Sequence, residues 1–224
     1  MNDFVPLEVV VTGDFACFTR PENKVERVSY PVMTPSAARG VLEAIYWKPE
    51  FSWRVLELHV LREIRQVSLL RNEIEDRQLH TGKTARGDPG GNYLADEHRA
   101  QRHTLALRGV AYLIRAEQVL RPHETKDIAK HRDCFRRRVQ SGQCFQQPYL
   151  GCREFAAEFR PPNGSDKPVD LTMDLGPMLF DLRYEHDKTG KGIGATPVFF
   201  DARLENGVLK VPQGLYEEVE GHVS

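Results

Sequence analysis

The sequence predicts an α+β protein, with a ferredoxin-like β-α-β-β-α-β domain followed by a small antiparallel β C-terminal region. The first observation is a β-branched run at residues 7–12, which is typical of a buried strand. The second is a pair of segments with helix-capping residues, at 34–49 and 125–142. The third is alternating hydrophobicity at 51–70 and 105–120, which favours strands between these helices. This order is the split β-α-β arrangement of ferredoxin-like folds.

The first helix has clear boundary signals. Thr34 suits the N-cap, Pro35 fits the first helical position, where its missing N–H costs nothing, and Pro49 ends the helix after roughly four turns. One face carries apolar residues at the spacing of a buried helix surface, namely Ala38, Val41, Leu42 and Ile45. We expect the end of this helix to present the Tyr-Trp-Lys sequence of residues 46–48.

The remaining elements of the first part are predicted from turn and cap residues. The long polar segment at 82–100 has the glycine and cation content of a functional loop, and Gly109 suggests a bulge in the strand after it. Thr125 is the expected N-cap of the second helix, which ends at Ser141 and Gly142. A further strand is expected at 153–159.

A domain boundary is expected at residues 161–165, which read Pro-Pro-Asn-Gly-Ser. It separates a first domain, 1–160, from a small β-rich domain, 161–224. Four short strands are expected in the second domain, at 170–175, 178–184, 197–203 and 208–211.

Charge is distributed unevenly, although the net charge is only −1. Residues 161–224 hold 6 Lys and Arg against 11 Asp and Glu, a net of −5, whereas the first 160 residues hold 25 against 21, a net of +4. A phosphate-binding surface is therefore expected in the first part. Its most basic segment is 121–138, although a charge run alone is usually a solvated helix face.

The composition excludes several classes of protein. No apolar run is long enough to span a bilayer and the N-terminus lacks the pattern of a signal peptide, so we expect a cytoplasmic protein without membrane contact. Cys17, Cys134, Cys144 and Cys152 are separated by 117, 10 and 8 positions, which gives no C-x-x-C pair. We therefore expect reduced, packed thiols, no metal site and no cofactor.

Two sequence blocks resemble a known family. Residues 29–49 read SYPVMTPSAARGVLEAIYWKP, and residues 142–155 read GQCFQQPYLGCREF. Both resemble the Cas-five family of CRISPR-associated proteins, in its subtype I-C (Dvulg) branch, and that family is similar to the wider RAMP superfamily of RNA-binding proteins. The pair Lys130 and His131 is a weaker third match. The likeness covers residues 5–160 and implies the same ferredoxin-like fold.

The resemblance implies a metal-independent endoribonuclease that cleaves CRISPR precursor RNA within each repeat. It also implies that the protein stays bound to the guide 5′ handle as a subunit of the type I-C surveillance complex. The implied partners are the stem-loop repeat RNA, the other subunits and double-stranded DNA. The alternative is a non-catalytic subunit that caps the guide RNA, as in other branches of the family.

The family's Tyr-Lys-His set carries over to Tyr46, Lys130 and His131. Attack by a ribose 2′-OH, which leaves a 2′,3′-cyclic phosphate, needs a base, an acid and a cation. His131 fits the proton shuttle, because an imidazole titrates near neutrality and a phenol only near about 10. Tyr46 would then orient the 2′-OH or assist as acid or base, and Lys130 would stabilise the charged phosphate. His123 is a rival base, and His131 would otherwise be a packed histidine on an apolar helix face.

Aromatic and cationic residues are the expected RNA ligands. Trp47, Tyr93 and Phe145 are candidates for stacking on unpaired bases, although Trp47 also suits a core position. The candidate phosphate ligands are Lys48, Lys83, Arg86, Arg136, Arg137 and Arg138.

Overall fold

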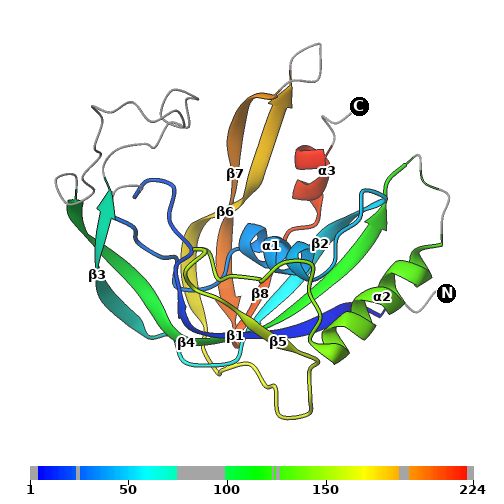
Figure 1. The fold of residues 1–224 in the computed structure, drawn as a ribbon, viewed down its shortest axis with the longest axis horizontal. Helices are drawn as coiled ribbons and strands as arrows, with labels where there is room; N and C mark the ends of the chain where they lie inside the picture. Colours follow the sequence, from blue (N-terminus) through cyan, green and yellow to red (C-terminus); the bar gives the residue numbers. More distant parts are fainter. Residues whose placement is uncertain are drawn as a thin grey trace, which may run out of the picture.

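The computed structural model describes residues 5–23, 26–74, 99–122, 124, 127–186 and 192–220. In chain order its elements are β1 (Leu7–Ala16), α1 (Pro35–Ile45), β2 (Phe51–Val60), β3 (Gln66–Ile74), β4 (Arg99–Leu120), α2 (Ile128–Ser141), β5 (Glu158–Arg160), β6 (Met173–His186), β7 (Gly192–Glu205), β8 (Val208–Lys210) and α3 (Gly214–Glu220). Within these residues the strands form one eight-stranded sheet, in the order β5-β1-β4-β2-β8-β7-β6, with β3 paired to β4. Figure 1 shows this sheet curling around α1. The predicted α+β class is confirmed.

Helix α1 begins as its sequence predicts. The Thr34 side chain accepts a hydrogen bond from the Ala37 N–H, and Pro35 occupies the first helical position. The expected apolar face is buried, and it places Leu42 and Ile45 against the sheet. Cap residues and apolar spacing are local signals, so the sequence was sufficient here.

The end of α1 differs from the prediction, because the helix stops at Ile45 and not just before Pro49. Tyr46 has extended backbone angles, φ −153° and ψ 117°. The last carbonyls are bound by other parts of the chain: the Ala44 oxygen accepts from the N–H groups of Phe145 and Gln146, and the Ile45 oxygen accepts from Arg138. The loop donors replace the Lys48 N–H that another helical turn would have supplied to Ala44, whereas Pro49 has no N–H to offer Ile45.

The alternating segments form strands, as predicted, and β2 and β3 both pair antiparallel with β4. The 22 residues of β4 pair with β3 at one end and with β2 at the other, and β1 pairs along its middle and second half. Gly109 has a φ of 64° at the point where β4 changes partner from β3 to β2. The register shift lies in β2, between Val55 and Glu57, and not at Gly109.

The N-cap of helix α2 is Asp127 and not the predicted Thr125. The Asp127 carboxylate accepts a hydrogen bond from the Ala129 N–H, whereas Thr125 lies outside the described residues. The predicted end is confirmed, since Gly142 adopts the left-handed conformation at φ 66°.

The strand after α2 is shorter than expected. It was predicted at 153–159, but β5 covers only Glu158–Arg160. The preceding residues turn, because Gly151, at φ 83°, lies so close to β1 that a Cβ would come within 2.0 Å of the Cys17 oxygen. The Leu150 N–H then bonds the Phe155 oxygen across this turn.

The C-terminal part differs most from the prediction. The two short strands expected at 170–175 and 178–184 are one strand, β6. Its pairing register with β7 shifts next to Gly176 and near Asp181. Helix α3 was not predicted. Strand β8 pairs with β2, so the sheet continues from the first part of the chain into the last. The two-domain division stays a prediction, with a boundary segment between β5 and β6.

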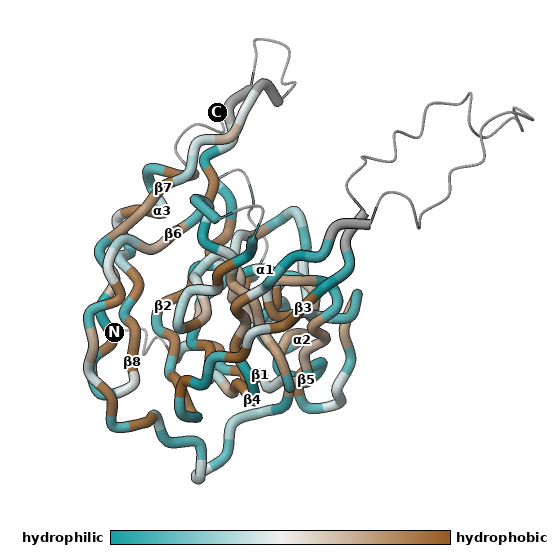
Figure 2. Tube along the Cα trace, turned by 90° about the vertical axis from the view of Figure 1, so that its left-hand side faces the viewer, coloured by the Kyte–Doolittle hydropathy of each residue, from teal (hydrophilic) through white to brown (hydrophobic). Residues whose placement is uncertain are grey.

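The main hydrophobic core lies between the sheet and the helices. Its largest buried side chains include Trp53 and Phe51 on β2 and Phe135 on α2. The Phe135 ring meets the Trp53 ring edge to face, with 4.8 Å between centroids, which fixes α2 against β2. Brown and teal residues alternate along β6 and β7 in Figure 2, as expected for strands with one buried face. None of the described helices is long and apolar enough to cross a membrane.

Candidate active site

Two of the three predicted catalytic residues meet at the C-terminal end of α1. The Tyr46 hydroxyl lies 3.0 Å from His131 Nδ1, although the residues are 85 positions apart in the chain. Tyr46 follows the last residue of α1, and His131 lies in the first turn of α2. Both side chains are almost fully buried, at 5% and 6% exposure. The packing of α1 against α2 therefore creates a hydrogen-bonded phenol–imidazole pair.

Strand β2 forms one wall of this site. The Phe51 ring stacks on Tyr46 with 5.7 Å between centroids and lies 5.1 Å from the His131 ring. The indole N–H of Trp53 donates to the Tyr46 carbonyl at 2.9 Å. These contacts hold the Tyr46 backbone and ring in place. The sequence analysis missed Phe51, because an apolar residue at the start of a strand carries no signal of ring contacts.

Arg138 forms another wall. Its guanidinium carbon lies 5.0 Å from the centre of the Tyr46 ring, and its Nη1 donates to the Ile45 carbonyl at 2.7 Å. Arg138 is seven residues after His131, so the two lie on the same face of α2. The predicted phosphate ligand thus contacts the candidate catalytic tyrosine and the end of α1.

The environment of Tyr46 changes its acidity. Burial first, and the neighbouring Cys134 thiol second, raise the pKa of Tyr46 to about 12, although Arg138 partly opposes this. The phenol is therefore protonated at neutral pH. Cys134 was not predicted at this site, although its position three residues after His131 on a helix was a usable signal.

The other predicted residues lie at different places. Lys130 is exposed on a neighbouring face of α2, so the structure does not bring it to the buried pair. Trp47 is 48% exposed and is followed by the exposed Lys48, both beyond the end of α1. The predicted residues outside the described ranges are Lys83, Arg86, Tyr93 and His123.

The arginine run 136–138 does not form one surface. Arg136 is exposed and forms an ion pair with Asp133 at 3.2 Å. Arg137 is also exposed, and its guanidinium lies 3.6 Å from the Cys134 sulfur. Helical geometry turns Arg138 toward Tyr46 and leaves the other two toward solvent. Three consecutive residues on a helix cannot share one face, which is why the run predicts a surface poorly.

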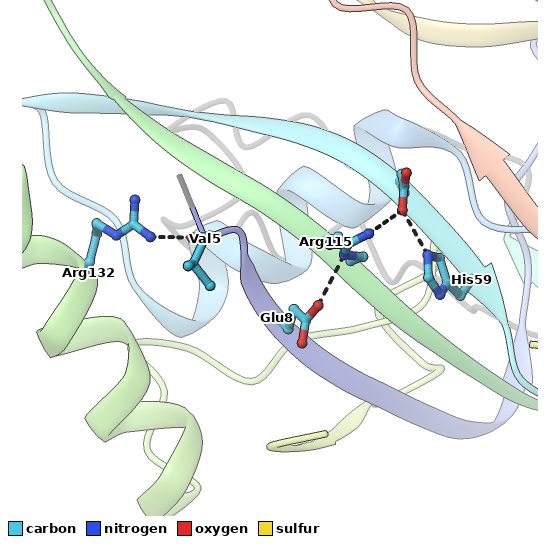
Figure 3. Close-up of polar contacts among 6 residues, drawn as sticks. Val5, Glu8, His59, Arg115 and Arg132 are labelled. Atoms are coloured by element: carbon cyan, nitrogen blue, oxygen red, sulfur yellow. Dashed lines mark hydrogen bonds and ion pairs between the residues drawn. The ribbon is translucent and has the colours of Figure 1, made fainter. Parts of the chain in front are cut away.

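A second histidine takes part in a polar ladder across β1, β4 and β2, drawn in Figure 3. Arg115 donates to Glu8 at 3.0 Å and to Glu57 at 2.7 Å, and His59 lies 3.0 Å from the same Glu57 carboxylate. Burial raises the pKa of Glu57, but hydrogen bonds from His59 and Arg115 outweigh it and bring the pKa below its usual value. Figure 3 also shows Arg132 of α2 reaching the Val5 carbonyl, so this cation binds the chain itself.

The cysteines are free thiols, and one of them is unusual. A hydrogen bond from Cys17 and the Arg27 guanidinium, whose Nη1 lies 3.2 Å from the sulfur, lower the pKa of Cys152 to about 6 against the effect of burial. Among the described residues, no group of three or more His, Cys, Asp or Glu side chains is arranged to hold a metal ion.

Comparison with known proteins places the fold first. A solved structure described as a CRISPR-associated protein superposes with a TM-score of 0.65 at 22% identity, over 93% of this chain and 92% of that one. The chain therefore shares the α+β fold of that structure.

Sequence comparison then gives the family. The family model described as CRISPR-associated protein (Cas_Cas5), of the Cas5d type, matches residues 7–212, so the chain belongs to this family. A relative from Thermus thermophilus, named CRISPR pre-crRNA endoribonuclease Cas5d, is 46% identical over 96% of this chain and 97% of its own length. One of the same name from Mannheimia succiniciproducens is 43% identical over 94% of this chain and 96% of its own.

Proposed function

We propose that this protein is an endoribonuclease that cleaves CRISPR precursor RNA within the repeat. The observation that carries the proposal is the 3.0 Å contact between the Tyr46 hydroxyl and His131 Nδ1. It joins two side chains that can transfer protons and that the resemblance to the family implies as catalytic. The names of the two curated relatives support the same activity.

In the proposed reaction, a ribose 2′-oxygen attacks the adjacent phosphorus and the bond from phosphorus to the 5′-oxygen breaks. The 2′-OH loses a proton and the departing 5′-oxygen gains one, so the upstream fragment keeps a 2′,3′-cyclic phosphate. No metal ion is needed for this balance. We assign the proton transfer to His131, because an imidazole exchanges protons near neutrality.

The state of Tyr46 defines which nitrogen of His131 takes part. A phenol whose pKa is about 12 is protonated at neutral pH, and we assign its oxygen as the acceptor of a hydrogen bond from the Nδ1–H of His131. The neutral imidazole then has a free lone pair on Nε2, which is the nitrogen that takes the proton of the 2′-OH and later gives it to the departing 5′-oxygen. Tyr46 thus sets the tautomer and orientation of His131, as a buried partner does for many catalytic histidines.

RNA must displace Arg138 to reach this pair, because the guanidinium covers the Tyr46 ring. A phosphate is a stronger partner for a guanidinium than a neutral carbonyl, so binding of RNA provides a reason for the movement. The displaced Arg138 and the exposed Lys130 are then the two cations proposed to stabilise the charged phosphorane.

The proposal extends to the assembly. The four strands in the order β5-β1-β4-β2, together with α1 and α2, support a ferredoxin-like module spanning residues 1–160, to which a smaller β-rich domain, 161–224, is added. After cleavage in the cytoplasm the protein would keep the 5′ handle of the stem-loop product. It would then act as a subunit of the type I-C surveillance complex, near double-stranded DNA.

The test is incubation of the purified protein with its own repeat RNA in EDTA, with analysis of the product ends. A cyclic phosphate on the upstream fragment is expected, and one 2′-deoxy substitution immediately 5′ of the scissile phosphate should block the reaction. A 3′-OH end would indicate a different mechanism. Tight binding without cleavage would favour the non-catalytic cap.

A further inference from the structure

The segment after α2, residues 142–151, lies alongside α1. Its Phe145 and Gln146 N–H groups bond the Ala44 oxygen near the end of α1. Its last residues reach β1, where the Cys17 N–H bonds the Leu150 oxygen at 3.0 Å. The loop and α1 therefore border a strip of the protein surface, and this strip starts next to the Tyr46–His131 pair.

A cavity of about 300 Å³ lies at the far end of this strip. Three small residues of α1, namely Ser36, Ala37 and Gly40, form part of its lining, and Tyr149 of the loop adds an aromatic ring. Thr19 and Ser36 contribute hydroxyl groups, which both donate and accept hydrogen bonds. The cavity is therefore lined by one aromatic ring, by a helix surface with small side chains, and by a few polar atoms.

Exposed aromatic residues follow the same strip. Trp47 lies beside Tyr46, Phe145 is 77% exposed next to the end of α1, and Tyr149 is 39% exposed at the cavity. Exposed aromatic rings such as these are available to stack on the faces of unpaired bases. From Gly40 to Ile45, the last residue before Tyr46, the helix advances about 7.5 Å, at about 1.5 Å per residue, a distance that a few nucleotides of single-stranded RNA can cover.

We propose that the cavity binds one unpaired base of the substrate RNA, stacked on Tyr149, and that Phe145 and Trp47 stack bases between it and the cleavage site. This inference rests on the proposed function, because a strand that is cut at His131 must continue along an adjacent surface. A base has a π-face for the Tyr149 ring and polar edges for the hydroxyl groups. The cavity would then set which unpaired position of the RNA is held in register with the scissile phosphate.

The test is a scan in which each nucleotide in turn lacks its base, with affinity measured for the wild type and for Tyr149→Ala. At one position, base removal should weaken wild-type binding about 5- to 100-fold, the loss expected for one stacked base, and should have little further effect in Tyr149→Ala. The same pattern of losses in both proteins would overturn the proposal. That result is also expected if the strip binds a protein instead of RNA.

Further variants separate stacking from folding. Gly40→Leu should abolish the same position-specific loss, because a Cβ at Gly40 has no atom within 4 Å and the larger side chain fills the cavity. Tyr149→Phe should keep it, since the ring remains. Tyr184→Ala is the matched control, because Tyr184 is also exposed, at 56%, but lies on β6. Loss of the pattern in Tyr184→Ala, or its persistence in Gly40→Leu, would contradict the assignment.

Cleavage of unmodified RNA by the wild type tests the proposed function separately. If RNA is cut but the scan shows no position that depends on Tyr149, the cavity assignment is wrong and the nuclease stands. If the position is found but RNA stays intact, the cavity assignment stands and the nuclease is wrong.

Discussion

Two histidines of this protein have a polar partner at the same distance, 3.0 Å, yet their surroundings differ. His131 meets a neutral phenol inside an aromatic enclosure. His59 meets Glu57, which Arg115 also binds, at a more exposed part of the sheet. Distance alone therefore does not distinguish the proposed proton-transfer site at His131 from the polar ladder at His59. Burial and the charge of the partner do.

The largest expected effect is the loss of cleavage on replacing His131. Removing a proton shuttle typically lowers a rate by about 10²- to 10⁴-fold, with little effect on ground-state binding. We expect His131→Ala to show this in single-turnover cleavage, while RNA affinity stays within a few-fold. His59→Ala is the matched control and should cleave normally. A folded His131→Ala that cuts at the wild-type rate would make His131 a packing residue.

Tyr46→Phe is expected to have the next largest effect. It keeps the ring against Phe51 but removes the hydroxyl, so Nδ1 loses its partner and the tautomer is no longer held. A lost hydrogen bond of about 1–3 kcal/mol corresponds to roughly a 5- to 150-fold lower cleavage rate. Because the pKa of Tyr46 is about 12, any rate change between pH 5 and 9 belongs to another group. That change should therefore persist in Tyr46→Phe, and its disappearance would assign the titration to the phenol.

The arginine run should divide into two classes of effect. Arg136 and Arg137 are exposed, so their double replacement should weaken RNA binding and reduce the slope of log affinity against log salt by about 0.7 per lost phosphate contact. Arg138→Ala should also lower the melting temperature, because it removes the contact with Ile45 and uncovers Tyr46. Salt titrations and thermal melts on both variants measure this. If both variants changed the salt slope and the melting temperature alike, the arginine run would act as one surface.

The smallest effect is expected at the polar ladder. Glu57→Gln should lower stability by about 0.5–1 kcal/mol, or about 1–4 °C in Tm, because its ion pairs are partly exposed to solvent. The pKa of Glu57 is lowered in the folded state, so its contribution is present above the unfolded-state pKa and is lost as pH falls through the folded one. Melts of wild type and variant should therefore converge in acid and differ at neutral pH. A gap that widens in acid, or a change in cleavage, would refute the structural role.

Local signals predicted several features well. Thr34 and Pro35 define the start of α1, Gly142 ends α2, and the two sequence blocks identify the family. Each depends on neighbouring residues, because caps, left-handed glycines and helical spacing act within a few positions of the chain. The α+β class followed from the same signals.

Errors were concentrated where distant residues compete with local preference. The end of α1, the short β5 and the long β6 all depend on hydrogen bonds or close approaches from elsewhere in the chain. The catalytic residues themselves were named from the sequence, but their roles stay predictions. The contact between them was not available from spacing, since 85 positions separate Tyr46 from His131.

The sequence by itself named the residues proposed to carry the chemistry, through the family resemblance and because a phenol, an imidazole and cations are properties of single side chains. Only the tertiary structure decided that Tyr46 and His131 meet while Lys130 does not, and that Arg138 lies over the Tyr46 ring. The physical reason is that successive residues on a helix point in different directions. The packing of α2 on β2 and α1 selects which of these directions faces inward, and burial there raises the pKa of the Tyr46 phenol.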